Sequence, residues 1–261
     1  MEQKGPLDLG LKTLEDLNVV RHNEYRFISS DFGFVNSFRK MEANLFAIGQ
    51  PYRIKEGRAA FVKNGTARIL INLIEYTIQR NHFAVITPNS IVQITEVSPD
   101  FDMQMIAIDQ AFLPISGKED LFSYLLHHQR NILLVLSPQE LLQAENYFTL
   151  MWNILQETTF RRDAIRHLLA SLLYYIEYVA QSNMLMNPIQ LTRQEDIFQR
   201  FISLVNAYSK KERNVDFYAD KLCLTPRYLN IVVRQASQQT VMDWINQSII
   251  LEAKVLLKHS N

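Results

Sequence analysis

Residues 215–234 of this 261-residue chain read VDFYADKLCLTPRYLNIVVR. Two short helices joined by a tight turn fit this stretch, because small or apolar residues recur where two steeply crossing helices must touch. These residues are Tyr218, Ala219, Leu222, Leu224, Leu229 and Val232. Thr225 suits the N-cap of the second helix, and Pro226 suits its first position, where a missing N–H costs nothing. The stretch therefore predicts a helix-turn-helix, a shape that presents its second helix to the DNA major groove.

The composition indicates a folded chain with a mildly basic C-terminal part. A hydrophobic content of 48% excludes global disorder, and the length suits two domains or one domain with helical appendages. The net charge is zero, which by itself argues against a nucleic-acid binder. However, residues 1–189 carry 17 Lys and Arg against 20 Asp and Glu, whereas residues 190–261 carry 10 against 7. This excess is weak support for DNA binding by the C-terminal part.

The sequence predicts a soluble, cytoplasmic protein without a membrane partner. No stretch approaches the roughly 20 apolar residues that a membrane-spanning helix needs, and the N-terminus has no apolar core typical of an export signal. The single cysteine, Cys223, excludes an intramolecular disulfide and is compatible with a reducing compartment.

Period-two alternation between residues 61 and 108 predicts β-strands. The β-branched runs are Ala67–Ile71, Ile74–Ile78, Phe83–Thr87, Ile91–Val97 and Met103–Ile108. The pair Asn64-Gly65 predicts a hairpin turn, because type I′ turns need positive φ at both central positions. Short antiparallel strands at this spacing indicate a small barrel or sandwich.

Helical periodicity follows from residue 137 onward. Helices over 137–157 and 161–181 are expected to pair as an antiparallel hairpin whose broad apolar face, with Tyr174, Tyr175 and Tyr178, needs a partner surface in the same chain or in a second copy. A linker is expected over 182–191. A helix capped by Thr192 and Glu195 then precedes the helix-turn-helix, and a long helix begins at Thr240 with Asp243.

This order of elements resembles the AraC/XylS family of bacterial transcription regulators. The likeness rests on FYADKL at 217–222, LTPRYL at 224–229, DWIN at 243–246 and EAKVLL at 252–257. It covers about 70 residues closely and the N-terminal part in architecture alone. The resemblance implies an α+β fold in four parts. These are a cupin-like antiparallel β-barrel that senses or regulates (1–136), a dimerising helical hairpin (137–181), a linker (182–191) and a partial DNA-binding domain (192–261).

Members of this family carry two helix-turn-helix units at the ends of a connecting helix, which here would be Thr240–Leu257. Roughly forty residues of the second unit are expected beyond the end of this sequence. Whether the chain has been shortened or is naturally short stays open at this point.

The resemblance implies a set of DNA-contacting residues on the second helix, namely Thr225, Arg227, Tyr228, Asn230, Ile231 and Arg234. Arg227 and Asn230 would reach neighbouring base pairs, and Arg234 would contact phosphate. Lys221 is either a phosphate contact or a solvated side chain. Many relatives carry arginine at the position of Ile231 and glycine at that of Gln238. Isoleucine can at most contact a thymine methyl, so this position offers no hydrogen bond to a base edge.

Sites of other kinds find little support in the sequence. Between Phe61 and Ile108, His82 is the single histidine, whereas cupin metal sites need several, so no metal, cofactor or catalytic residue is expected. His127 and His128 are expected at the surface, and Cys223 is expected to have a packing role. Arg68, Glu75 and Tyr76 lie on candidate strands, but none is assigned to an effector.

The sequence thus predicts a homodimeric, sequence-specific DNA-binding regulator that is not an enzyme. Its partners would be promoter or operator DNA, a small-molecule effector and RNA polymerase. Effector binding would shift the population between DNA-binding-competent and incompetent geometries. Two alternatives stay open: a sensing and dimerising fragment with little DNA binding of its own, and a cupin-type enzyme.

Overall fold

The computed structural model describes residues 8–11, 22–40, 47–109, 112–113, 131–186 and 193–256. Contacts divide the chain into two compact units. One, the N-terminal unit, consists of Leu7–Ile71 and Glu75–Asn187, and the other, the C-terminal unit, contains Pro188–Asn261. No helix among the described residues is long and apolar enough to cross a membrane. His127 and His128 lie outside the described residues, as do Thr192 and the second half of the expected linker.

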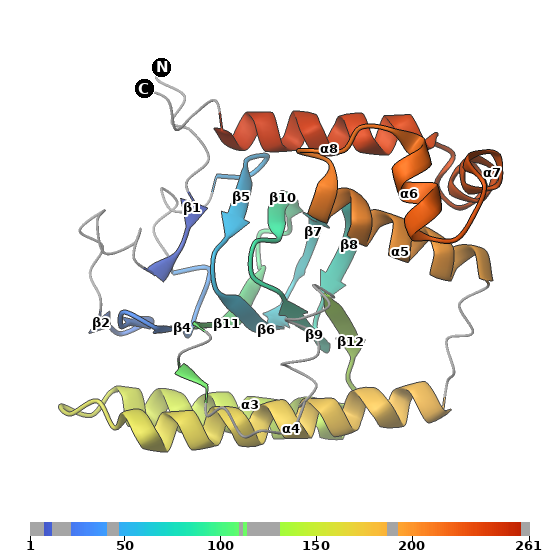
Figure 1. The fold of residues 1–261 in the computed structure, drawn as a ribbon. Helices are drawn as coiled ribbons and strands as arrows, with labels where there is room; N and C mark the ends of the chain where they lie inside the picture. The colour runs from blue at the N-terminus through green and yellow to red at the C-terminus, as the bar shows by residue number, and fades with distance from the viewer. Residues whose placement is uncertain are drawn as a thin grey trace. The chain divides into compact units, whose positions relative to one another are not determined.

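The N-terminal unit holds two β-sheets (Figure 1). The five-stranded sheet has the order β1-β5-β10-β7-β8, and the seven-stranded sheet has the order β12-β9-β6-β11-β4-β3-β2. The strands are β1 (Asp8–Leu9), β2 (His22–Asn23), β3 (Arg26–Ile28), β4 (Phe32–Val35), β5 (Pro51–Ile54), β6 (Gly57–Asn64), β7 (Thr66–Ile71), β8 (Ile74–Gln79), β9 (His82–Ile86), β10 (Ile91–Val97), β11 (Asp102–Ile108) and β12 (Ile132–Val135). The five expected runs are thus confirmed as β7 to β11. The expected cupin-like barrel is not closed, because the strands form two separate sheets, and β1 pairs with β5 in parallel rather than antiparallel.

The hairpin expected at Asn64-Gly65 is wrong. β6 pairs with β9 and β11, whereas β7 pairs with β10 and β8, so this turn carries the chain from one sheet to the other. Gly65 has φ 71°, but Asn64 is not among the residues with positive φ. A Cβ on Gly65 would lie 2.6 Å from the Cα of Phe101, so close approach of two backbones requires the glycine. The turn with positive φ at two successive residues is Asn72-Leu73, between β7 and β8.

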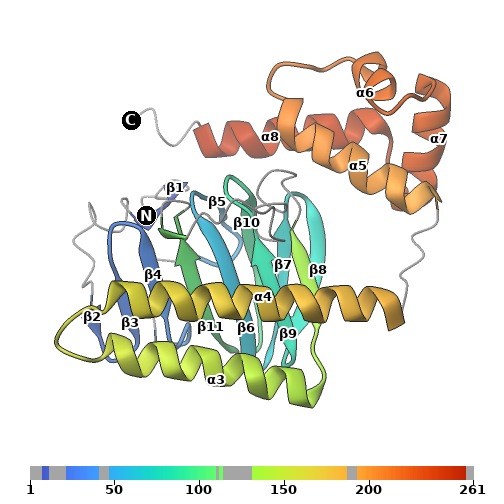
Figure 2. The same ribbon diagram turned by 60° about the horizontal axis from the view of Figure 1, so that its bottom comes forward.

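Helices α3 (Pro138–Leu155) and α4 (Arg162–Met186) lie side by side along one face of the seven-stranded sheet (Figures 1 and 2). Ser137 caps α3 by accepting from the backbone N–H of Glu140, and the Glu140 carboxylate accepts from the backbone N–H of Ser137. This reciprocal cap, together with Pro138 in the first turn, fixes where α3 begins. α4 runs five residues beyond the expected end at Gln181, because no helix breaker precedes Pro188.

The broad apolar face of the helical hairpin is covered within the same chain in large part, whereas Tyr174 and Tyr178 stay exposed. Phe148, Met151, Leu169 and Leu172 are fully buried in one cluster with Phe61 and with other side chains of β4, β6, β9 and β11. The opposite side chains of the seven-stranded sheet pack in a second cluster with β7, β8 and β10. Because both faces of β6 are covered, its central residues form a continuous buried run.

An ion pair fastens the start of α4 to the sheet. The Arg162 guanidinium donates to the carboxylate of Asp31, in the turn between β3 and β4, and lies 4.8 Å from the Phe112 ring centroid. The hydrogen bond from Arg162 lowers the pKa of Asp31 below its ordinary value.

Candidate nucleic-acid interface

The C-terminal unit contains α5 (Arg193–Tyr208), α6 (Val215–Lys221), α7 (Pro226–Ser237) and α8 (Val241–Leu256). α6 and α7 are the two helices expected from residues 215–234. The turn between them closes with two hydrogen bonds: the Leu224 N–H donates to the Ala219 carbonyl at 2.9 Å, and the Cys223 N–H donates to the Asp220 carbonyl at 3.0 Å. This pattern ends a helix through a left-handed residue, here Cys223 at φ 57°.

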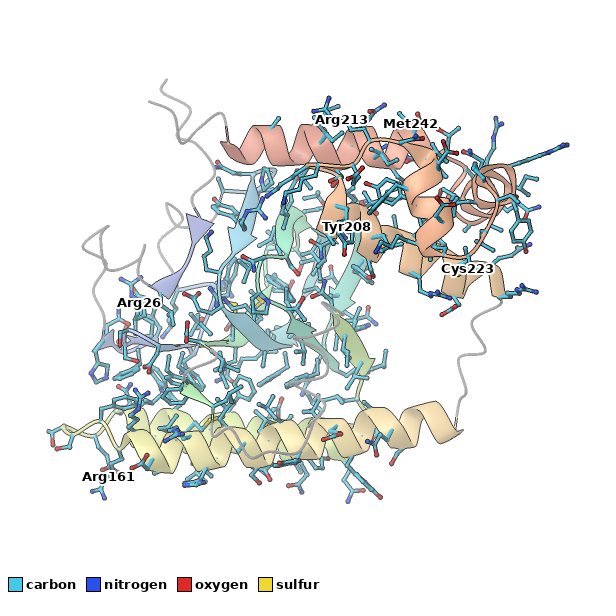
Figure 3. All side chains as sticks on the ribbon, viewed as in Figure 1. Arg26, Arg161, Tyr208, Arg213, Cys223 and Met242 are labelled. Carbon is cyan, nitrogen blue, oxygen red and sulfur yellow. The ribbon has the colours of Figure 1, made fainter. Side chains whose placement is uncertain are left out.

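Cys223 has no packing role, contrary to the sequence analysis. Its side chain is exposed in the connection between α6 and α7 (Figure 3). The sequence pattern does not indicate this exposure, because the residue follows directly on the buried Leu222, while the left-handed backbone turns its side chain outward.

The start of α7 is built as its sequence predicts. The Thr225 hydroxyl oxygen accepts from the backbone N–H of Tyr228 at 3.2 Å, and Pro226 occupies the first turn. The cap satisfies one of the N–H groups that a helix start leaves without an intrahelical partner.

α6 and α7 cross over a fully buried contact. Tyr218, Ala219, Leu229 and Val232 have no exposed surface, and Leu222 is also buried. Phe201 of α5 meets the Tyr218 ring edge-on, with the ring centroids 5.9 Å apart. The expected contact residues are therefore confirmed, except that Leu224 is partly buried. Ala219 is small at the place where α7 presses on α6, so a larger side chain there would force the two helices apart.

Ionisation of the Tyr218 hydroxyl at high pH is expected to destabilise this contact. It donates to the Glu212 carbonyl at 2.7 Å, and burial, with Glu212 adding to it, raises the pKa of Tyr218 to about 12. Because the folded pKa lies above the unfolded value of about 10, the tyrosine contributes stability that is fully present below pH 10 and is lost as pH rises towards 12. We expect Tyr218→Phe to cost about 1 kcal/mol at pH 7.

The same variant tests whether ionisation of Tyr218 causes the loss of stability at high pH. The free energy of unfolding of the unmodified chain should fall by about 1.4 kcal/mol per pH unit above pH 10, relative to Tyr218→Phe. Urea unfolding followed by circular dichroism should therefore show the two stabilities meeting near pH 11, at about one unit above the unfolded pKa. A constant difference from pH 7 to 12 would contradict the assignment.

An exposed face of α7 carries two arginines. Arg227, Ile231 and Arg234 are exposed and recur at helical spacing, so they share one side of the helix. Tyr228 is 37% exposed and Ile231 is 45% exposed. The structure thus brings four of the six candidate residues to the surface of α7, with Thr225, also exposed, at its head.

Asn230 is placed differently from the other candidates. It is partly buried; its amide nitrogen donates to the Pro226 carbonyl at 3.2 Å, and its side-chain oxygen accepts from the Val241 N–H at 3.3 Å. These bonds direct the amide towards the start of α8. Local sequence could not show this, because the contact with Val241 crosses the turn between two helices.

Further polar contacts fix α8 to the end of α7. The hydroxyl oxygen of Thr240 accepts from the Asp243 N–H at 3.1 Å, and the Asp243 carboxylate accepts from the N–H and hydroxyl of Thr240. The hydrogen bonds from Thr240 lower the pKa of Asp243, and Arg234 adds to this effect. The indole N–H of Trp244 donates to the Ser237 hydroxyl at 2.8 Å. The expected start of the last helix is confirmed.

Gln238 ends α7 with a left-handed backbone, φ 60°. This conformation costs a non-glycine residue about 1 kcal/mol, so Gln238→Gly should raise the free energy of unfolding by about that amount. Gln235→Gly, at an exposed position inside α7, is the matched control and should lower it by about 1 kcal/mol. Urea unfolding of both variants gives the two changes in the free energy of unfolding. Destabilisation by both glycines would contradict the expected role of Gln238.

Lys221 lies over two aromatic rings. Its ammonium group is 5.8 Å from the ring centroids of both Tyr208 and Phe217. An ammonium over aromatic faces is stabilised by the ring electrons, which is a structural role for this side chain.

The remaining candidates lie in the N-terminal unit. His82 begins β9, and its Nδ1 is 3.1 Å from the Gln79 carbonyl oxygen. Arg68 forms an exposed ion pair with Glu96, and Glu75 is exposed, whereas Tyr76 is partly buried. Among the described residues, no group of three or more His, Cys, Asp or Glu side chains is placed to hold a metal ion.

Comparison with known proteins gives structural likeness alone. No protein-family model and no curated protein matches the chain. The fold is similar to ToxT from Vibrio cholerae with an unsaturated fatty acid bound (14% identity, TM-score 0.38, 83% of this chain and 79% of that chain). It is also similar to the AraC-like transcriptional activator CuxR (11% identity, TM-score 0.36, 87% and 78%). The identities and TM-scores are low, so what these two proteins bind or do is said of them and not of this chain.

Proposed function

We propose that this chain is a sequence-specific DNA-binding transcription regulator of the AraC type. The observation that carries the proposal is α7 itself: a helix capped at Thr225, seated on α6 and exposing Arg227 and Arg234 along one face. A short helix braced in this way can enter the major groove, where its exposed side chains reach base edges. Such a regulator would act in the cytoplasm.

The exposed side chains of α7 suit different contacts. Arg227 lies in the first turn, where a guanidinium could bond the O6 and N7 of a guanine. Arg234 lies in the last turn and suits phosphate, which sets register without reading sequence. Ile231 between them offers apolar contact to a thymine methyl, and Thr225 and Tyr228 would contact DNA at the head of the helix.

The N-terminal unit would supply dimerisation and effector sensing. The outer side of the helical hairpin exposes four large side chains that the sheet does not cover: Leu142, Leu150, Tyr174 and Tyr178. We assign homodimerisation to this side of residues 137–181. An effector bound in residues 1–136 would then bias how the dimer presents its DNA-binding parts, and RNA polymerase would be a further partner.

A second candidate function is a sensing and dimerising fragment with little DNA binding of its own. Asn230 favours it, because its amide is directed to Val241 rather than along the exposed face of α7. Ile231 also favours it, since an isoleucine in the middle of that face can donate no hydrogen bond. Two arginines would then give affinity near the non-specific range, roughly 10⁻⁴ to 10⁻⁶ M.

Adding a charge to α7 tests whether this helix contacts DNA. Ile231→Arg should strengthen binding to duplex DNA by about fivefold or more and steepen the slope of log K against log salt by about 0.9. Fluorescence anisotropy at several salt concentrations measures both quantities. The matched control is Ile250→Arg on α8, which is 54% exposed and adds the same charge. Equal gains from both variants would mean that overall charge, not α7, governs binding.

A further inference from the structure

A cavity of about 70 Å³ lies between the two sheets of the N-terminal unit. Its wall comes from β5, β7, β8 and β10 on one side and from β6, β9 and β11 on the other. The pairing of β6 with β9 explains the space, because Ala60 stands directly opposite Ala84, and Met105 of β11 pairs with Ala60. Two facing alanines leave room that larger side chains would fill.

The wall of the cavity is mostly apolar. Most of the lining residues are isoleucine, valine, alanine, methionine or phenylalanine. The Tyr52 hydroxyl accepts from the Ala47 N–H at 2.6 Å, so its oxygen is engaged in a contact with the backbone. The remaining polar side chain in the wall is Arg58, which is 3% exposed.

The charge of Arg58 is already balanced inside the protein. Both of its terminal nitrogens lie 3.2 Å from one carboxylate oxygen of Glu56, and the other oxygen accepts from the Leu11 N–H at 2.8 Å. An anionic ligand would have to compete with this buried ion pair, and removing one partner from such a pair is strongly unfavourable. The electrostatics of the cavity therefore disfavour a carboxylate or phosphate.

Water is also a poor occupant. A water molecule needs about 10–15 Å³ of such volume but also two to four polar partners, and a wall of hydrocarbon supplies few. An apolar cavity of about 150 Å³, roughly twice the volume of this one, stays dry and binds benzene or xenon. Met103 and Met105 add adaptability, because the unbranched thioether can change rotamer to fit a ligand.

We propose that this cavity binds a small, neutral, apolar molecule, no larger than a single aromatic ring. Naming that molecule the effector rests on the proposed regulatory function, whereas its binding does not. Neutral recognition follows from the paired Arg58, and size follows from the space left by Ala60 and Ala84.

Methyl NMR of the full chain, labelled at isoleucine and methionine, tests the proposal. Xenon and benzene are the neutral probes, and benzoate is the anionic counterpart of benzene. We expect saturable shifts at Ile69, Ile78, Met103 and Met105 with the neutral probes and none with benzoate. Ala84→Val should weaken benzene binding by about tenfold or more because it fills the cavity. Thr77→Val, at an exposed position of β8, is the control and should leave binding unchanged.

The outcomes separate this proposal from the regulatory one. Absence of shifts with both neutral probes, or benzoate binding as well as benzene, would overturn the cavity assignment. Because the shifts are mapped in the unmodified chain, the test holds even if Ala84→Val fails to fold. If the neutral probes bind but the chain shows no DNA binding, the cavity stands and the regulatory function fails. If the chain binds DNA but binds neither neutral probe, the regulatory function stands and the cavity assignment fails.

Discussion

Phe148→Ala is expected to lower the free energy of unfolding of the N-terminal unit by about 3–5 kcal/mol. Phe148 has no exposed surface, and its ring meets those of Phe34, Phe61 and Phe83 with centroids 5.5, 4.8 and 6.3 Å apart. Truncation removes these contacts and leaves a cavity where α3 joins the seven-stranded sheet, and rigid strands on the other side cannot close it.

Thr149→Ala is the control on the same helix. Thr149 is exposed and is not among the side chains assigned to the dimer, so its truncation should change the free energy of unfolding by no more than about 0.5 kcal/mol. Urea unfolding followed by circular dichroism gives both values. A loss below about 1 kcal/mol for Phe148→Ala would mean that the hairpin is not fastened to the sheet through this side chain.

Removing both arginines from α7 is expected to abolish sequence-selective DNA binding. Arg227→Ala alone should weaken binding to the preferred site by roughly 10- to 100-fold and relax the preference at one base pair, because a bidentate contact to guanine gives about 1–3 kcal/mol of discrimination. Arg234→Ala alone should weaken binding to all sequences alike and reduce the salt slope by about 1. The double variant should show both effects together.

Arg161→Ala is the control for loss of charge. Arg161 lies before α4 in the N-terminal unit and forms an exposed ion pair with Glu157, so its removal should leave DNA affinity unchanged. Competition binding against duplexes altered at single base pairs distinguishes lost readout from lost affinity. Identical specificity profiles for Arg227→Ala and Arg234→Ala would contradict the separate roles assigned to the two arginines.

Local patterns in the sequence predicted the strands but not their partners. The runs that became β7 to β11 alternate because each strand has two different faces. At Asn64-Gly65 the dipeptide correctly marks a turn, but whether β6 and β7 pair depends on β9 and β11, which come later in the chain. The helical hairpin shows the same limit: periodicity revealed its apolar face, and Phe61 and Phe83, which help cover it, lie far away in sequence.

In the candidate interface, too, contacts between neighbouring residues were predictable and contacts between distant residues were not. The Thr225 cap and Pro226 were predictable because a cap involves neighbouring residues. The contact of Asn230 with Val241 was not, since it depends on how α8 returns to α7. The left-handed backbones of Cys223 and Gln238 were not predicted either, because neither residue type favours that conformation.

Selection of duplexes from a random-sequence pool by the full chain tests whether α7 reads DNA sequence. The chain and its Arg227→Ala/Arg234→Ala variant would be compared at two salt concentrations, with bound DNA sequenced after each round. We expect the unmodified chain to enrich a short motif and the double variant to enrich none. Enrichment of the same motif by both proteins would show that α7 does not read DNA, and enrichment by neither would favour the sensing and dimerising fragment.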